Sequence, residues 1–310
     1  MRIVSLLPSA TEIICGLGLR PQLVGVTHEC DYPADVVGLP IVTSSRIPKG
    51  LSSAEIDARV NGQLDTESAL YSLNQERLEA LQPDLIVTQA LCDVCAVSAE
   101  EVNAISCQLP GNVRVVNLEP ACLGDVLDTV LLVGEAAGCG ERAQQYHTQL
   151  EQRVTAVAQR SRNLSDRQRP RVAILEWVDP LFDGGHWYPE LIELAGGTPC
   201  FGDPHGPSRR RNWSDLVAAA PDVLLVSLCG FDLQRTARDI PLLTNHPDYG
   251  MLPAAKTGRV FAVDGNRYFS RPGPGLVDSL EILANLLHPD IHPLPAGLAP
   301  AMCVSTEEWS

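Results

Sequence analysis

Residues Glu141 to Arg162 read ERAQQYHTQLEQRVTAVAQRSR, and this stretch decides the fold of the chain. Apolar side chains recur in it at three- and four-residue spacing with Glu, Gln and Arg between them, which predicts an amphipathic helix. Glycines at 138 and 140 precede it, and a polar segment that ends at Pro170 follows it. A helix of about 22 residues is ~33 Å long, close to the width of a small domain. We therefore expect this helix to join two folded bodies.

A sequence repeat relates the two sides of that helix. The pattern LxAxxPD that begins at Leu78 and continues as LIVT returns 138 residues later, at Leu216, and continues there as VLLV. One such match is common in α/β proteins, but RIVSL with RVAIL and VRVVN with VFAVD repeat in the same order. Strands that alternate with helices indicate parallel sheets. The repeat thus predicts an α/β fold of two Rossmann-like lobes with parallel sheets, joined by one long rigid α-helix.

The predicted domains follow from these elements. The N-terminal lobe covers residues 1–138, the linking helix with its flanks 139–168, and the C-terminal lobe 169–289. Prolines multiply from His288 onward, so residues 290–310 are predicted to form a disordered tail. The predicted strands are 2–7, 23–27, 83–88, 113–117, 171–175, 221–226 and, last in the chain, 259–263; the predicted helices besides the linker are 8–16, 53–62, 65–71, 74–81, 99–109, 123–137, 189–194, 213–220 and 275–287.

The composition limits the partners. The 310 residues include 23 Lys plus Arg and 38 Asp plus Glu, and a net charge of −15 argues against nucleic acid or an anionic membrane. No apolar run reaches the ~18 residues of a membrane span, so no membrane insertion is expected. Pro8 and Glu12 interrupt the apolar run at the N-terminus, unlike a signal peptide. We therefore expect a cytoplasmic monomer whose ten cysteines are thiols; a periplasmic location would require a start upstream of Met1.

Aromatic side chains gather in the loops expected after the strands of the second lobe. Aromatic residues make up only 5% of the chain. In parallel sheets these loops lie at the carboxyl ends of the strands, where ligands bind. Ring faces there can cover a large flat ligand, and about half of the rings are expected to pack the lobe core instead. The rings are Trp177, Trp187, Tyr188, Phe231, Tyr268 and Phe269.

The first lobe offers His28, Glu29 and Cys30 in a polar loop after a short strand. The neutral imidazole of His28 could ligate the metal of a bound ligand, and the alternative is a hydrogen bond to a loop carbonyl. His186 and His205 are rival candidates for the same role. Ser9 or Thr11 is expected to cap the helix that begins at Pro8.

Cys92 and Cys95 form a single CxxC after the predicted strand 83–88. Three interpretations stay open: a redox pair, part of a zinc site with Cys30 and His28, or loop packing. We expect no structural metal, because a second CxxC is absent from the sequence. Sequence motifs of hydrolases and of phosphate loops are also absent, and Glu176 with Asp179 lacks a partner acid, so nothing demands catalysis.

Several motifs in order give the chain a family resemblance. The segments SLLPSATEI, VGVTHECDYP, LEALQPDLIV and GGHWYPELIELAGG, with the linking helix, resemble the helical-backbone class (class III) of ABC-importer substrate-binding proteins, of the periplasmic-binding-protein-like fold. The resemblance extends over about residues 2 to 288 and is greatest to the cobalamin-binding subgroup, including members without an export signal.

The resemblance implies a ligand and its contacts. A non-enzymatic protein of this class would hold cobalamin or a related corrinoid flat between the lobes; haem or an iron-siderophore is the alternative, and a thiol- or corrinoid-dependent enzyme is the third. Trp177 and Tyr268 align with contact loops of the family. The expected ligand-binding residues are Pro8, Ser9, His28, Glu29, Cys30, Gln89, Cys92, Glu176, Trp177, Asp179, His186, Trp187, Cys229, Phe231 and Tyr268.

Docking on a transporter is the remaining implication of the resemblance. Family members pair a glutamate of each lobe with a permease arginine, and Glu76 fits the first-lobe position. The repeat places its counterpart at Ser214, beside Asp215, so one docking charge is missing or displaced. We therefore expect an intracellular carrier, sensor or buffer of corrinoids, with an ABC permease as a further candidate partner. The basic run Ser208 to Arg211 is expected to be solvated or to meet polar edges of the ligand.

Overall fold

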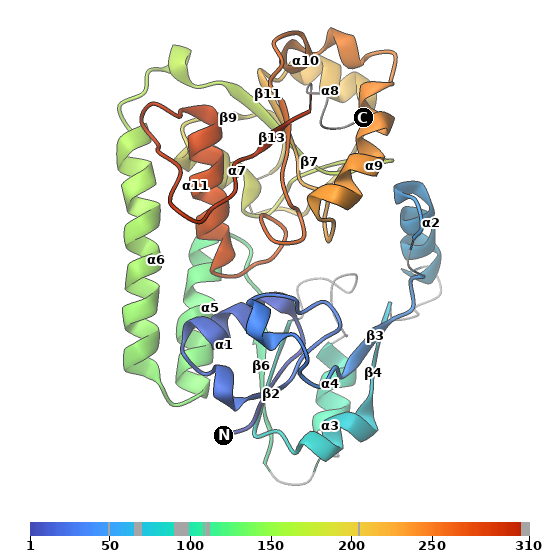
Figure 1. Ribbon diagram of the computed structural model, residues 1–310, viewed down its shortest axis with the longest axis vertical. Coiled ribbons are helices and arrows are strands. Elements are labelled where there is room, and N and C mark those ends of the chain that lie inside the picture. The colour runs from blue at the N-terminus through green and yellow to red at the C-terminus, as the bar shows by residue number, and fades with distance from the viewer. Residues whose placement is uncertain are drawn as a thin grey trace. The chain divides into compact units, whose positions relative to one another are not determined.

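The computed structural model of the protein describes residues 1–48, 50–64, 70–89, 99–107, 109, 112–203 and 205–304. The chain forms two compact units, each with its own sheet (Figure 1). Unit 1 comprises Met1–Leu51, Glu55–Pro120 and Gly124–Leu150, and unit 2 comprises Ser52–Ala54, Ala121–Leu123 and Glu151–Ser310. The predicted linking helix is α6 (Gly140–Ser161), and the boundary between the units lies inside it. The α/β fold with two sheets and a connecting helix is confirmed.

Unit 1 is built on a four-stranded sheet with the order β2-β1-β5-β6, and all its strand pairs are parallel. A separate antiparallel pair, β3 (Thr43–Ser45) and β4 (Tyr71–Leu73), brackets α2 (Ser53–Leu64) in the sequence. The other elements are β1 (Ile3–Ser5), α1 (Pro8–Gly16), β2 (Leu23–Gly25), α3 (Gln75–Leu81), β5 (Leu85–Gln89), α4 (Ala99–Ser106), β6 (Arg114–Leu118) and α5 (Leu123–Ala136), with 3-10 helices at Arg20–Gln22 and Ala34–Val36.

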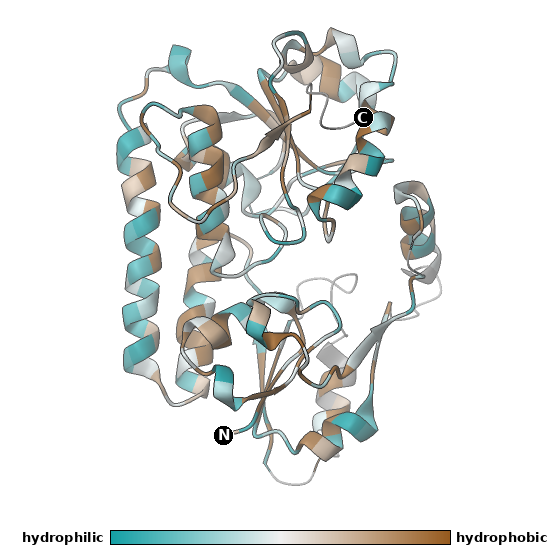
Figure 2. Ribbon diagram, viewed as in Figure 1, coloured by the Kyte–Doolittle hydropathy of each residue, from teal (hydrophilic) through white to brown (hydrophobic). Residues whose placement is uncertain are grey.

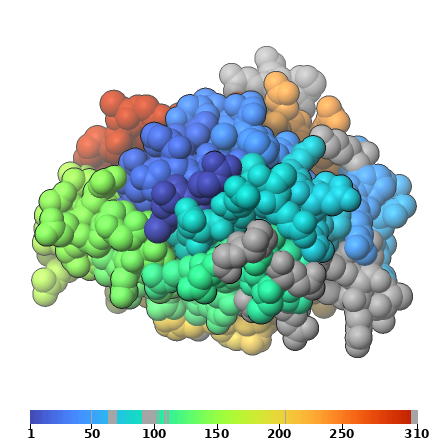
Figure 3. Space-filling model, turned by 90° about the horizontal axis from the view of Figure 1, so that it is seen from below, coloured from blue at the N-terminus to red at the C-terminus, as the bar shows by residue number. Residues whose placement is uncertain are grey.

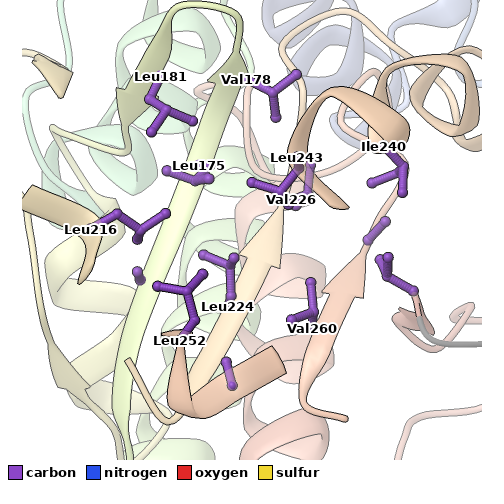
Figure 4. Packing of buried hydrophobic residues seen from close by; sticks show 14 of the residues in the cluster. Leu175, Val178, Leu181, Leu216, Leu224, Val226, Ile240, Leu243, Leu252 and Val260 are labelled. Atoms are coloured by element: carbon purple, nitrogen blue, oxygen red, sulfur yellow. The ribbon is translucent and has the colours of Figure 1, made fainter. Parts of the chain in front are cut away.

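Unit 2 contains a larger sheet with the order β10-β8-β7-β11-β12-β13, and β9 pairs with β7. Its parallel centre is buried by leucine, isoleucine and valine side chains from the strands and from α8, α9 and the segment before α10 (Figure 4). The elements are β7 (Arg171–Val178), β8 (Leu181–Asp183), α7 (Tyr188–Leu194), β9 (Thr198–Pro199), β10 (Arg210–Arg211), α8 (Trp213–Ala219), β11 (Val223–Val226), α9 (Leu233–Thr244), α10 (Pro253–Lys256), β12 (Val260–Ala262), α11 (Gly275–Leu287) and β13 (Met302–Cys303), with 3-10 helices at Asp166–Gln168 and Tyr249–Met251.

The sequence repeat is reproduced in the hydrogen bonds of the two units. The Asp84 carboxylate accepts the backbone N–H of Arg2 at 2.6 Å, and the Asp222 carboxylate accepts that of Arg171 at 2.9 Å. The Nε of each arginine also donates to the carbonyl of the last residue of the helix that precedes the Pro-Asp motif. This residue is Leu81 of α3 for Arg2 and Ala219 of α8 for Arg171. The strand order β9-β7-β11-β12 of unit 2 matches β2-β1-β5-β6 of unit 1. The Pro-Asp motif therefore marks the same helix-to-strand junction twice.

The helix α6 has the amphipathic pattern predicted for it. Ala143, Leu150 and Val157 are buried, while the Glu, Gln and Arg side chains between them give the helix its hydrophilic colour in Figure 2. Burial of one apolar stripe stabilises a long surface helix more than its intrinsic propensity does. Arg153, on the same helix, forms ion pairs with two carboxylates of α11, with Asp278 at 2.7 Å and with Glu281 at 2.5 Å.

Four local predictions are wrong. The predicted loop after Leu175 is strand, because β7 continues to Val178 and turns back at once into β8. Tyr71 lies in β4 rather than at a helix end, and residues 65–69 of that predicted helix lie outside the described part. Neither Ser9 nor Thr11 caps α1, whose N-cap position is Leu7 without a side-chain cap.

The disorder predicted for residues 290–310 is the fourth, and it is wrong for residues 290–304, whereas residues 305–310 lie outside the described residues. The tail continues as the antiparallel strand β13 on β12, so β12 is not the last strand, and Val304 is buried in the core of unit 2. Apolar and polar burial orders residues 290–304 despite their prolines, because the tail covers a strand edge that would otherwise be unpaired.

Candidate functional site

A pair of partly exposed aromatic rings lies at the carboxyl ends of β7 and β11 in unit 2. Trp177 is in β7 just before its turn, and Phe231 follows β11 by five residues. Their ring centroids are 5.1 Å apart and the rings are tilted by 50°. The guanidinium of Arg235 lies over Phe231, 4.1 Å from the ring centroid. We call Trp177 and Phe231 the ring pair.

Tyr268 occupies the next loop along the same edge, after β12. Its ring is partly exposed and lies 5.0 Å from the guanidinium of Arg267. The loop is held tightly, because the backbone N–H of Phe269 donates to Ser279 Oγ at 2.9 Å and Phe269 has a left-handed φ of 68°. A Cβ on Gly265 would lie 2.1 Å from the carbonyl oxygen of Leu228, so only glycine allows the loops after β11 and β12 to approach this closely.

Three of the six predicted rings belong to the core of unit 2. Trp187 is 4% exposed, Tyr188 2% and Phe269 0%, and they stack in sequence at centroid distances of 6.2 Å. The indole N–H of Trp187 donates to the Phe269 carbonyl at 2.8 Å. The Trp187 ring is therefore covered by its neighbours within unit 2, and its contact with a ligand stays a prediction. The expectation that about half of the rings pack the core is confirmed.

Polar residues from the prediction lie at the same sheet edge as the ring pair. Glu176 is partly exposed in β7, and its carbonyl accepts the backbone N–H of the exposed Cys229 at 3.1 Å. Asp179 is exposed in the turn after β7, and its carbonyl accepts the Trp177 indole N–H at 3.1 Å. His186 is half-buried, and burial lowers its pKa. The structure thus brings Glu176, Asp179 and Cys229 to the same edge as Trp177 and Phe231.

In unit 1 the structure adds a ring that the sequence analysis missed. Tyr71 lies against His28 with ring centroids 5.4 Å apart, and the Tyr71 hydroxyl donates to Glu29 Oε1 at 3.0 Å. His28 Nδ1 is 2.8 Å from Thr43 Oγ1, so this hydroxyl orients the imidazole. Tyr71 lies on β4, which pairs with β3 and is thereby brought back to the loop after β2. Tyr71 follows Thr43 by 28 residues, and no local pattern in the sequence indicated this contact.

The remaining first-unit predictions comprise one partly exposed residue, three buried residues and one residue outside the described part. Pro8 begins α1 and is partly exposed, whereas Ser9, Cys30 and Gln89 are buried. The Cys30 thiol lies 3.1 Å from Thr11 Oγ1, which itself donates to Ser5. Cys92, together with its CxxC partner Cys95, lies outside the described residues.

Other charged candidates have simple structural surroundings. His205 is exposed with a left-handed φ of 63°. In the basic run, Arg211 pairs with the buried Asp183 at 2.7 Å and Arg209 pairs with Asp203, so two of its three arginines have partners within unit 2. Over the part of the chain that is described, no three His, Cys, Asp or Glu side chains converge as a metal site would require.

The predicted docking glutamate, Glu76, lies on α3 of unit 1. Glu76 is exposed in the first turn of α3. Arg77, Ala80 and Leu81 of this helix border an open groove of about 550 Å³ whose other wall is residues 38–41. Figure 3 shows these two segments side by side on one face of unit 1, in blue and cyan. The groove thus lies between α3 and the last part of the connection from β2 to β3.

The sequence from residue 3 to residue 266 matches the family described as "Periplasmic binding protein". The chain belongs to this family. A relative from Bacillus subtilis, described as an uncharacterized ABC transporter substrate-binding lipoprotein, YvrC, is 24% identical over 93% of this chain and 80% of its own length. Among the helices of the described residues, none combines the length and apolarity of a membrane span.

Solved structures show the same fold. The periplasmic vitamin B12 binding protein BtuF of Vibrio cholerae superimposes with a TM-score of 0.66 at 20% identity, covering 92% of this chain and 96% of that one. A periplasmic heme-binding protein from Pseudomonas aeruginosa gives a TM-score of 0.74 at 20% identity, with coverages of 98% and 99%. The class III fold predicted from the motifs is thus confirmed.

Proposed function

We propose that the chain is a non-enzymatic substrate-binding protein for cobalamin or a related corrinoid. The observation that carries this proposal is the placement of Trp177 at the end of β7 and of Phe231 and Tyr268 in the loops after β11 and β12, where all three are partly exposed at one edge of the unit 2 sheet. Rings in this arrangement supply apolar area to a macrocycle, and ligand sites of open α/β sheets lie at this edge. The similarity to a vitamin B12 binding protein supports the corrinoid.

The polar side chains at the same edge complement such a ligand. A corrinoid has an apolar macrocycle face and a periphery of amide groups, which donate and accept hydrogen bonds. Glu176 offers a carboxylate at the same end of β7 as Trp177, and Arg267 offers a guanidinium beside Tyr268. In unit 1, Glu29 and the His28 imidazole are the corresponding polar groups. His28 is the candidate axial ligand of the cobalt.

Haem is the second candidate, and the Tyr71–His28 contact favours it. Both phenolate and imidazole ligate haem iron in proteins. The hydrogen bond from the Tyr71 hydroxyl to Glu29 makes the phenol oxygen a better electron donor. The similarity to a heme-binding protein supports this alternative.

A calorimetric titration with cyanocobalamin, cobinamide, haemin and a ferric chelate decides between them. We expect one-to-one binding of cyanocobalamin and cobinamide, weakened about 30-fold or more by Trp177→Ala, because large aromatic anchors dominate binding energy. Trp213→Phe is the matched control. Trp213 stacks on His246 after the 12-residue helix α9, about 18 Å along that helix from Phe231. Binding of haemin alone would replace the corrinoid by haem.

The visible spectrum of the bound ligand tests the axial ligand. His28→Ala should shift the cobalt absorption bands of bound aquocobalamin, while His205→Ala, in an exposed loop, should not. Unchanged bands in His28→Ala, with cobalamin still bound, would exclude His28 as the ligand.

We also propose that the protein acts in the cytoplasm as a carrier or sensor, with an ABC permease as a further candidate partner. The unequal docking positions, Glu76 on α3 and Ser214 on α8, support this proposal. Fractionation of native cells tests it: the protein should remain with the cytoplasm, and periplasmic release would contradict the assignment.

A further inference from the structure

Three residues far from the candidate site in the sequence belong to unit 2. Ser52–Ala54 are part of unit 2, although the residues before and after them are part of unit 1. Ser53 is 0% exposed. Its hydroxyl donates to Asp239 Oδ2 of α9, and its carbonyl accepts the indole N–H of Trp177 at 3.2 Å. This segment therefore contacts Trp177, one member of the ring pair.

A closed chain of contacts links Ser53 to both members of the ring pair. Asp239 is 5% exposed and pairs with Arg235 at 2.9 Å. Arg235 covers Phe231 at 4.1 Å, Phe231 lies 5.1 Å from Trp177, and Trp177 donates back to Ser53. A buried carboxylate is costly unless its oxygens are satisfied, so the Ser53 hydroxyl and the Arg235 guanidinium are both needed to keep Asp239 in place.

Ser53 is fully buried, and its contact with the ring pair is the hydrogen bond from the Trp177 indole N–H to its carbonyl. The Trp177 indole N–H is shared between the carbonyls of Ser53 and Asp179, at 3.2 and 3.1 Å, and two acceptors fix the plane of the indole. Without the anchor on Asp239, the Ser53 carbonyl would be held only by the flanking chain. The Asp179 carbonyl, in the turn after β7, would then remain as the better-fixed acceptor of the indole N–H.

We propose that Ser53 is a positioning residue for the Trp177–Phe231 pair, the ring surface that the proposed function assigns to the ligand. Ser53 is also the first residue of α2. The orientation of Trp177 and the anchoring of the α2 start are therefore set by the same two hydrogen bonds. Because coupling between two equilibria is reciprocal, a ligand that packs on Trp177 stabilises the anchored start of α2.

The experiment records the indole N–H resonance of Trp177 and its hydrogen exchange in the ligand-free, ¹⁵N-labelled full chain. The resonance is assigned by its loss in Trp177→Phe. Ser53→Ala should shift this resonance and speed its exchange by about tenfold, the size expected for losing a hydrogen bond to a charged group. The matched control is Ala54→Ser, an exposed change in the same segment, which should leave both unchanged. An unmoved resonance with unchanged exchange in Ser53→Ala overturns the proposal.

A binding cycle with cyanocobalamin separates positioning from general damage. Ser53→Ala should weaken binding about three- to tenfold in the wild-type chain and have no further effect in Trp177→Phe. Equal weakening in both backgrounds would overturn the positioning role. Asp239→Asn, which keeps an acceptor for the Ser53 hydroxyl but loses the charge, is the second variant and should give a smaller indole shift of the same direction. This inference rests on the proposed function only for the binding arm, because the indole measurement needs no ligand.

Discussion

Acid should destabilise unit 2 through His292, in the tail that covers its sheet. This histidine is 2% exposed, and its Nε2 is 2.9 Å from the hydroxyl of Ser161 at the end of α6. Asn285 donates to the His292 carbonyl at 2.8 Å, which holds the tail against α11. Burial, with the nearby Arg160 and His288, lowers the pKa of His292 from 6.5 to about 4. Replacing His292 by Gln keeps a polar partner for Ser161 and removes the titration.

The sign follows from the direction of the shift. Between pH 6.5 and about 4 the unfolded chain binds a proton that folded His292 refuses, so acid favours unfolding over this window. Each pH unit there costs at most ~1.4 kcal/mol. The full window gives an upper limit of about 3 kcal/mol, and relaxation and water entry leave about half of it. The stability that unit 2 gains from neutral, buried His292 is fully present above pH 6.5 and fully lost below pH 4.

Urea denaturation at pH 7.5 and pH 4.5 measures this contribution. The wild-type free energy of unfolding should fall by about 1–2 kcal/mol more than that of His292→Gln across this interval. His205→Asn removes an exposed histidine and should follow the wild type. Parallel losses in the wild type and His292→Gln would refute the reasoning, because the acid sensitivity would then come from other groups.

Four further variants have expected outcomes. Gln82 and Ala220 follow α3 and α8 in the left-handed region, with φ of 45° and 42°. Gln82→Gly and Ala220→Gly should each raise the free energy of unfolding in urea by about 0.5–1 kcal/mol, because glycine adopts this conformation without strain. A lower free energy of unfolding in either variant would contradict this explanation. Arg153→Met should lower it by about 1–2 kcal/mol, because Asp278 and Glu281 lose their shared cation; this loss should shrink in high salt. A chain ending at residue 287 should unfold at lower temperature and aggregate, since the edge of β12 loses β13; unchanged melting would show that the tail is dispensable.

The parts of the fold that the sequence predicted well are those that depend on local chemistry. The helix α6 was predicted to within one residue, because its apolar stripe is regular and glycines precede it. The Pro-Asp junctions were predicted in both units because the motif itself ends the helix and begins the strand. At Asp84 and Asp222 the carboxylate bonds the first strand of its own unit, which explains why the motif recurs.

The candidate site was predicted less completely, because its arrangement depends on contacts between distant residues. Trp177 and Trp187 were both expected in loops that face a ligand, yet tertiary packing buries Trp187 and leaves Trp177 partly exposed. Tyr71 reaches His28 through the β3–β4 pairing, and Ser53 reaches Trp177 across 124 residues. Periodicity and turn chemistry contain no information on such pairings. The same is true of the tail, whose prolines suggested disorder although Val304 lies in the core of unit 2.

The central claim is that the ring pair of unit 2 forms the surface for a corrinoid. Titration of the ¹⁵N-labelled chain with cyanocobalamin, or with haemin if that ligand binds instead, tests it most directly. At one equivalent the indole N–H resonance of Trp177 should shift under the ring current of the macrocycle, while that of Trp213, stacked on His246, should stay in place. A saturating ligand that leaves the Trp177 resonance unmoved would contradict the account.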